Sequence, residues 1–76
     1  GHILLLKNPD VPGVVGLVGT LLGEAGLNIA NIAWGRDEAA GQAQTLINLD
    51  QPVPDDLYAR ILEHPKVLWA ARVRLP

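Results

Sequence analysis

Polar side chains gather around one turn-forming stretch near the start of the chain. Asn8 and Asp10 follow an apolar run, two prolines restrict the backbone, and Gly13 stands where a helical pattern begins. The first turn of a helix leaves backbone N–H groups without partners, and a glycine there places no side chain in front of them. A carboxylate beside free N–H donors suits a small ligand, above all one that carries a carboxylate. The alternative is a tight strand-to-helix turn that binds nothing.

A further polar residue, Asn28, opens the second predicted strand. In the expected topology the start of the first helix and Asn28 lie at opposite ends of the sheet, so Asn28 is a poor partner for Asp10 within one chain. In a symmetric dimer joined along the second strands, Asn28 of one copy could approach the Asp10 loop of the other. A ligand bound there would link two subunits.

Composition excludes several other chemistries. The chain has neither Cys nor Ser, which rules out disulfides and thiol or serine nucleophiles, and His2 and His64 have no companions at metal-ligand spacing. A net charge of −2 argues against nucleic acid. No apolar run approaches the length of a membrane span. Asp10 has no titratable partner for acid–base catalysis. Trp34 and Trp69 are interpreted as core or interface residues, and we expect no catalytic residue and no metal site.

Hydrophobic periodicity predicts six elements that would position these residues. The first helix contains Gly16, Gly19 and Gly23 in a flat stripe, which either packs against another backbone or makes the helix locally floppy. The second strand changes phase near Ala30-Asn31, which predicts a β-bulge. Pro54 fits the first position of the second helix. The predicted strands are 2–7, 27–36, 42–49 and 67–75, the helices are 13–25 and from 54 to before Pro65, and 36–41 is a hairpin loop.

The order β-α-β-β-α-β predicts an α+β fold of ferredoxin-like type, with a four-stranded antiparallel sheet and both helices on one face. No linker interrupts residues 1–76, so we expect one domain. The chain is 49% hydrophobic, which is high for 76 residues and predicts an oligomer. The start at Gly1 without any Met suggests a piece of a longer enzyme chain.

Two segments resemble the signature of the ACT domain family. They are Asp10-Val11-Pro12-Gly13-Val14-Val15-Gly16 and Gly26-Leu27-Asn28-Ile29-Ala30. The whole chain, through Leu49-Asp50-Gln51-Pro52-Val53-Pro54, is most similar to the C-terminal regulatory domains of D-3-phosphoglycerate dehydrogenases. The resemblance implies a cytoplasmic homodimer, joined through the edge strand 28–36 and the neighbouring helix into an eight-stranded sheet, that binds an amino acid at the interface.

The resemblance also implies the ligand and its contacts. In these dehydrogenases the effector is L-serine, the end product of the pathway. Asp10 would accept from its ammonium, Asn28 would contact its amino and carboxylate groups, and the helix start would donate to the carboxylate. Asn8 departs from the family, in which His or a larger polar or aromatic residue is frequent. The family's ligand positions fall on Asn8, Asp10, Asn28 and the backbone of Val11, Pro12, Gly13 and Val14.

No cofactor is expected in this domain, whereas NAD is expected in the catalytic domain of such a parent enzyme. Three alternatives remain open. The first is a structural dimerisation module without an effector, and the second is an ACT domain of another enzyme or regulator of amino-acid metabolism. The third, a small enzyme of acylphosphatase type, lacks a suitable phosphate-binding pair of Arg and Asn.

Overall fold

The computed structural model describes residues 1–9, 13–37 and 41–75 and contains the predicted six elements in the predicted order. The third strand has the predicted bounds, and the other elements differ by one or two residues at an end. The elements are β1 (His2–Pro9), α1 (Val14–Glu24), β2 (Ile29–Asp37), β3 (Gln42–Leu49), α2 (Asp55–Glu63) and β4 (Trp69–Arg74).

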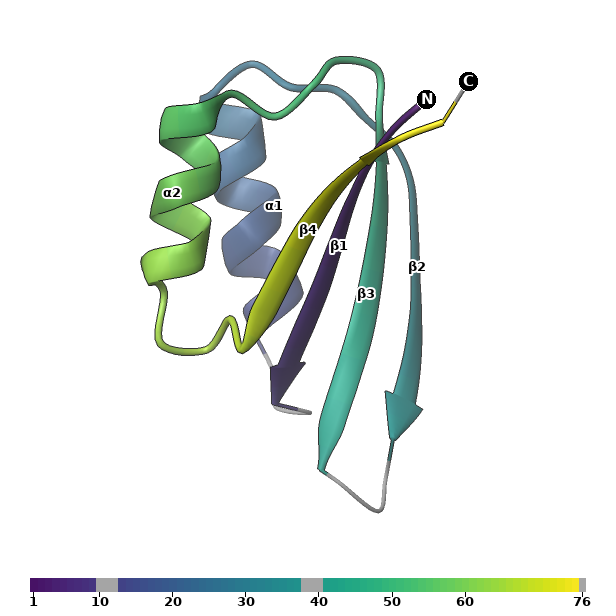
Figure 1. The fold of residues 1–76 in the computed structure, drawn as a ribbon, viewed down its shortest axis with the longest axis vertical. Coiled ribbons are helices and arrows are strands. Elements are labelled where there is room, and N and C mark those ends of the chain that lie inside the picture. The colour runs from purple at the N-terminus through teal and green to yellow at the C-terminus, as the bar shows by residue number, and fades with distance from the viewer. Residues whose placement is uncertain (10–12, 38–40, 76) are drawn as a thin grey trace.

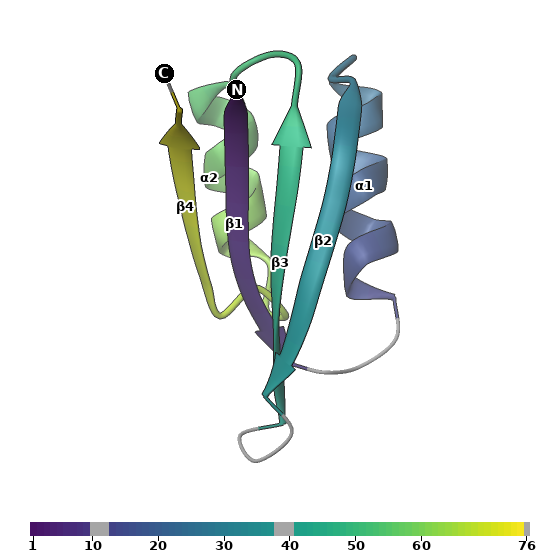
Figure 2. The same cartoon turned by 90° about the vertical axis from the view of Figure 1, so that its right-hand side faces the viewer.

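The four strands form one antiparallel sheet in the order β2-β3-β1-β4, so β2 and β4 are the edge strands. Both helices lie on the same face of the sheet, α2 behind β4 and β1 and α1 behind β2 (Figures 1 and 2). The opposite face carries no element of the described chain (Figure 2). Neither described helix is long and apolar enough to cross a membrane. The ferredoxin-like α+β prediction is confirmed.

The core lies between the sheet and the two helices. Alternate residues of β1 point toward the helices, so that Leu4 and Leu6 are buried while Lys7 is exposed. Ile47 on β3 lies beside them and is fully buried. The helices complete this layer with residues spaced three and four apart. The buried helical residues of the core cluster are Val18, Leu22, Leu57 and Ile61.

The predicted β-bulge is confirmed at the start of β2. Ile29 pairs with Leu49, but the next pair joins Asn31 to Asn48, so the register shifts across Ala30. After this shift Ile32 and Trp34 lie opposite the buried Ile47 and Thr45, and therefore on the helix side of the sheet. Trp34 nevertheless remains 63% exposed and Trp69 47% exposed. Of the two interpretations of these tryptophans, the core is therefore wrong, and the interface stays a prediction.

Two details of α2 differ from the prediction. Pro54 precedes the helix as its N-cap, because its ψ of 154° is extended and the first helical residue is Asp55. His64 likewise follows the helix, in an extended conformation. Leu57 and Ile61 are the buried residues of α2, and Leu62 beside them, predicted to be buried, is 45% exposed.

The glycine stripe of α1 meets nothing within the described chain. A Cβ built on Gly16, Gly19 or Gly23 finds no neighbouring atom within 4 Å outside the helix itself. Close approach of another backbone from the same chain is therefore not the reason for these glycines. Helix α1 lies behind the edge strand β2 (Figure 2), and its three glycines have room for a neighbour.

We expect Gly19→Ala to raise the free energy of unfolding by about 1 kcal/mol, because alanine restricts the unfolded chain and has room in the helix. Urea denaturation measures this change. Leu22→Ala is the reference variant: this residue of the same helix is fully buried, and its truncation should lower the free energy of unfolding by about 2–5 kcal/mol. A loss of stability in Gly19→Ala at protein concentrations at which the domain is monomeric would contradict the expectation, whereas a loss that appears only where the domain dimerises would indicate that a second chain packs against the stripe.

Candidate functional site

Three of the predicted ligand-binding residues, Asp10, Val11 and Pro12, lie outside the described residues. Both flanks of this loop are described. Pro9 ends β1, and Gly13 directly precedes α1. The loop therefore connects the end of a central strand to the start of the helix that covers the β2 side of the sheet (Figure 1).

The start of α1 exposes backbone donors as predicted. Gly13 has a φ of 94°, a left-handed conformation that suits glycine, and its carbonyl accepts the first helical hydrogen bond, from Leu17 N–H at 2.9 Å. No side chain among the described residues caps this end, and its first turn has no acidic residue. Val14 is 2% exposed and anchors the first turn in the core. This end of the helix therefore favours a negatively charged group.

Asn8 is held inside the domain. Its side chain is 3% exposed, and its Oδ1 accepts a hydrogen bond from Thr45 Oγ1 at 3.3 Å. Its Nδ2 donates to the carbonyl of Pro9 at 3.0 Å. Because both ends of the amide are bonded within the chain, Asn8 fixes the backbone where β1 leads into the loop. Its predicted contact with a ligand stays a prediction.

Asn28 is exposed and is tied to the residues that follow β3. Its Nδ2 donates to Oδ2 of Asp50 at 2.5 Å. Its backbone N–H donates to Oε1 of Gln51 at 3.1 Å, and its carbonyl accepts from Asp50 N–H at 3.1 Å. Three hydrogen bonds thus hold this residue at the start of the edge strand, just before the bulge.

The predicted residues divide between the two ends of the domain. Asn8 and Gly13 lie where β1 ends and α1 begins, whereas Asn28 follows the far end of α1 and begins β2 (Figure 1). The prediction that Asn28 is a poor partner for the Asp10 loop within one chain agrees with this arrangement of the described flanks. Within one chain, Asn8 and Gly13 therefore lie apart from Asn28.

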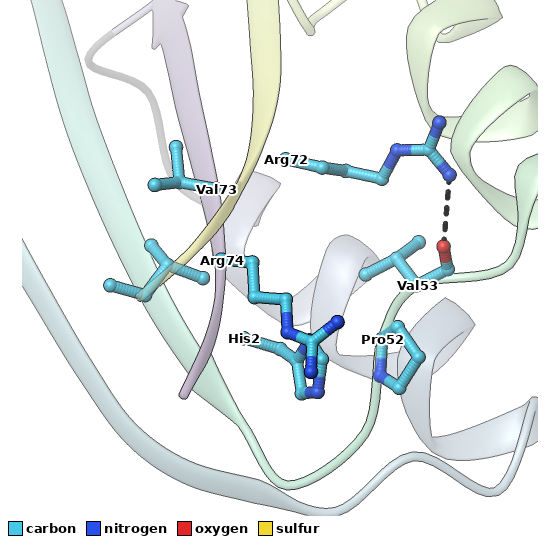
Figure 3. A pocket seen from close by; sticks show the side chains of 7 residues that line it. His2, Pro52, Val53, Arg72, Val73 and Arg74 are labelled. Carbon is cyan, nitrogen blue, oxygen red and sulfur yellow. Dashed lines mark hydrogen bonds between the residues drawn. The ribbon is translucent and has the colours of Figure 1, made fainter. Parts of the chain in front are cut away.

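A cavity of about 260 Å³ lies at the same end as Asn28 but contains none of the predicted residues. Arg72 on its wall is engaged in the fold: Nη1 donates to the carbonyl of Val53 at 3.0 Å and pairs with Asp55 at 2.6 Å. Its guanidinium also lies 4.2 Å from the ring centre of Tyr58. Figure 3 shows Arg74 beside His2 and Pro52 at the rim. The wall consists of His2, Ile3, Pro52, Val53, Arg72, Val73 and Arg74.

Asp50 and Gln51, whose side chains bind Asn28, were not predicted as its neighbours from the sequence. A signal was available, since an antiparallel hairpin places the first residue of one strand beside the last residue of the next. Metal binding has no support in the described ranges, where no group of three His, Asp or Glu side chains could hold an ion.

Comparisons with known proteins give a consistent result. Residues 2–65 match the family model described as "ACT domain". The chain is 37% identical over 75 residues to D-3-phosphoglycerate dehydrogenase of Methanocaldococcus jannaschii, covering 99% of this chain and 14% of that protein. It is 30% identical over 76 residues to D-3-phosphoglycerate dehydrogenase of Bacillus subtilis, again covering 14% of its length.

A solved structure supports the fold alone. Formyltetrahydrofolate deformylase from Pseudomonas putida KT2440 superposes with a TM-score of 0.79 at 20% identity, over 97% of this chain and 28% of that one.

We expect Thr45→Val to lower the free energy of unfolding by about 1–3 kcal/mol, because it leaves the buried Oδ1 of Asn8 without its donor. Thermal or urea unfolding measures the change. Thr20→Val is the matched control: its hydroxyl bonds the Gly16 carbonyl at an exposed site, so its effect should stay within about 0.5 kcal/mol. Equal effects in the two variants would show that the Asn8 bond contributes nothing particular.

Proposed function

This chain belongs to the ACT domain family, and we propose that it is an amino-acid-binding regulatory module that senses L-serine at a dimer interface. Its similarity to D-3-phosphoglycerate dehydrogenases at 30% and 37% identity supports a role in regulating such an enzyme in serine biosynthesis. The feature that carries the proposal is Asn28, held rigidly at the start of an edge strand that has a free side.

The chain spans 14% of the length of these two relatives, so catalysis would belong to the rest of a parent enzyme. NAD would likewise be bound by the catalytic part of that parent, in the cytoplasm, and the domain would contribute regulation only. Within the described residues we find no arrangement that suggests a reaction of its own.

Strand β2 is the better of the two edges for pairing with a second copy. It has nine residues against six in β4, and it carries the exposed Ile32 and Trp34 on the helix side. Charged side chains protect an edge against pairing; β4 carries Arg72 and Arg74 among its six residues, whereas the charged residues of β2, Arg36 and Asp37, are confined to its last two positions. Helix α1 covers the face of the sheet toward which Trp34 points, and its glycine stripe would extend the contact to the neighbouring helix.

Antiparallel pairing of two β2 strands would unite the separate half-sites. Nine residues at about 3.3 Å each span about 30 Å. The longest dimension of the domain is 33 Å. The start of the partner's β2 therefore reaches the end of the domain where α1 begins, and Asn28 of the partner subunit would come beside the Asp10 loop. Two equivalent sites result from the two-fold symmetry.

The ligand would be bound by groups of opposite polarity. The N–H groups at the start of α1, from Gly13 and Val14 onward, would donate to the carboxylate of the amino acid. Asp10 would accept from its ammonium, and Asn28 of the other subunit would close the site. Backbone contacts from Val11 and Pro12 would complete the wall, and Asn8 would support the loop from the core.

A purely structural dimerisation module is the second candidate, and the exposed apolar side chains of β2 favour it equally. Only a sensor gains stability from an effector, by RT ln(1 + [L]/Kd), which is about 2.7 kcal/mol at a hundredfold excess over Kd. An ACT domain that serves another enzyme of amino-acid metabolism would respond to a different amino acid.

We expect L-serine to raise the melting temperature of the wild-type domain and to release or absorb heat on titration. Asn28→Ala should weaken binding at least tenfold, because it removes a contact from the partner's side. Asp56→Ala, an exposed acid on α2, is the control and should bind like wild type. A domain that forms dimers but shows neither heat nor thermal shift with L-serine is a structural module or senses another amino acid.

Mixing two defective variants tests the shared site. Asp10→Ala and Asn28→Ala homodimers should each bind poorly, because every site lacks one group. In a mixed dimer one of the two sites receives Asp10 and Asn28 from the chains that still have them. Random exchange should therefore restore about a quarter of the wild-type sites, counted by titration. If mixing restores none although native mass spectrometry shows mixed dimers, the two residues do not share a site across the interface.

A further inference from the structure

The residues that hold Asn28 in place form a compact polar cluster at the surface. Asp50 follows β3 directly, and its Oδ2 lies 2.5 Å from Nδ2 of Asn28. Gln51 accepts from the Asn28 backbone N–H at 3.1 Å. All three residues are exposed, although their mutual orientation is fixed by hydrogen bonds to two strands. The cluster therefore presents an ordered set of polar atoms to solvent.

The chemistry of this contact fixes the orientation of the Asn28 amide. An ionised carboxylate only accepts hydrogen bonds, so the NH₂ group of Asn28 must face Asp50. Its carbonyl oxygen then points away as an acceptor. The second oxygen of Asp50 adds another acceptor and a full negative charge. No cationic side chain among the described residues forms an ion pair with Asp50.

We propose that Asp50 and Asn28 together form the ammonium-binding half of the effector site. This inference rests on the proposed function and deepens it by assigning a ligand contact to Asp50. An α-ammonium has three N–H donors, and the Asn28 carbonyl and the Asp50 carboxylate of one subunit offer acceptors to two of them. The carboxylate of the ligand lies at the start of α1, where the described first turn has no acidic side chain.

This division of charge defines the class of ligand. The negative half, with Asp50, comes from one subunit and the positive half, at the start of α1, from the other. A zwitterionic α-amino acid bridges both halves, whereas a 2-hydroxy acid of the same shape places an uncharged hydroxyl at the Asp50 carboxylate. The site thus selects amino acids over the corresponding hydroxy acids, and Asp50 supplies the selectivity.

A purely structural role for Asp50, as a link between the ends of β2 and β3, makes a different prediction. Asp50→Asn keeps an oxygen that can accept from the Asn28 amide and removes only the charge. Gln51→Ala removes one hydrogen bond of the cluster and leaves the charge in place. The two variants therefore separate electrostatic recognition from local structure.

The test is calorimetric titration of the full chain with each L-amino acid, followed by titration of the variants with the ligand that binds most tightly. We expect Asp50→Asn to raise Kd at least tenfold and Gln51→Ala less than threefold, with Asp56→Asn unchanged. With L-serine as ligand, the ratio of affinities for L-serine and L-glycerate should fall at least tenfold in Asp50→Asn. Circular dichroism and unfolding of the ligand-free variants verify that each is folded.

The outcomes separate the two levels of the proposal. If the wild-type domain binds an amino acid and Asp50→Asn binds it equally well, Asp50 only links the strands and this inference is overturned alone. Equal losses in Asp50→Asn and Gln51→Ala also overturn it, because the loss then follows local structure. If the wild-type domain binds none of the amino acids, the proposed sensing function fails and takes this inference with it.

Discussion

The domain depends on one apolar layer, in which Leu4, Leu6 and Ile47 of the central strands pack against Val18, Leu22, Leu57 and Ile61 of the helices. With 76 residues the chain can cover only one face of its sheet. The opposite face and the β2 edge are left to solvent or to partners. The apolar residues of this chain therefore lie in two places. Some form the small core, and others, such as Trp34, remain exposed at the surface.

The polar residues are likewise divided between the core and the surface. Asn8 is bonded inside the domain and fixes the end of β1, while Asn28 is bonded at the surface and stays accessible. Rigid placement at both ends of a stiff sheet reduces the ordering cost of binding, since few side chains must be immobilised when a ligand arrives. The proposed site, divided between two subunits, would also couple ligand binding to the association of the subunits, as a regulatory module requires.

Most of the fold could be predicted from periodicity, because alternation in strands and three-four spacing in helices report directly which side is buried. Strand β3 and the bulge at Ala30 were located in this way. The start of α2 could not be located in this way, because a proline is compatible both with the first helical position and with the position before it. The partners of Asn28 were missed for another reason: Asp50 and Gln51 become its neighbours only through the register of β2 on β3. The sequence pattern placed Asn8 after the first strand, whereas the structure includes it in β1, where its burial and its bond to Thr45 depend on the pairing of β1 with β3.

The bulge at Ala30 determines which face of the sheet carries the apolar side chains of the edge strand β2. Ile29 lies on the helix side, and if Ala30 were paired in a regular ladder, strict alternation would bring Asn31, Ala33 and Gly35 to that side and turn Ile32 and Trp34 to the bare face of the sheet. Deletion of Ala30 would therefore leave Ile32 and Trp34 on the helix side, in a strand without a bulge. The unpaired residue brings a sequence whose apolar residues change phase into one continuous apolar row, so that Ile29, Ile32 and Trp34 all lie on the same surface of the domain.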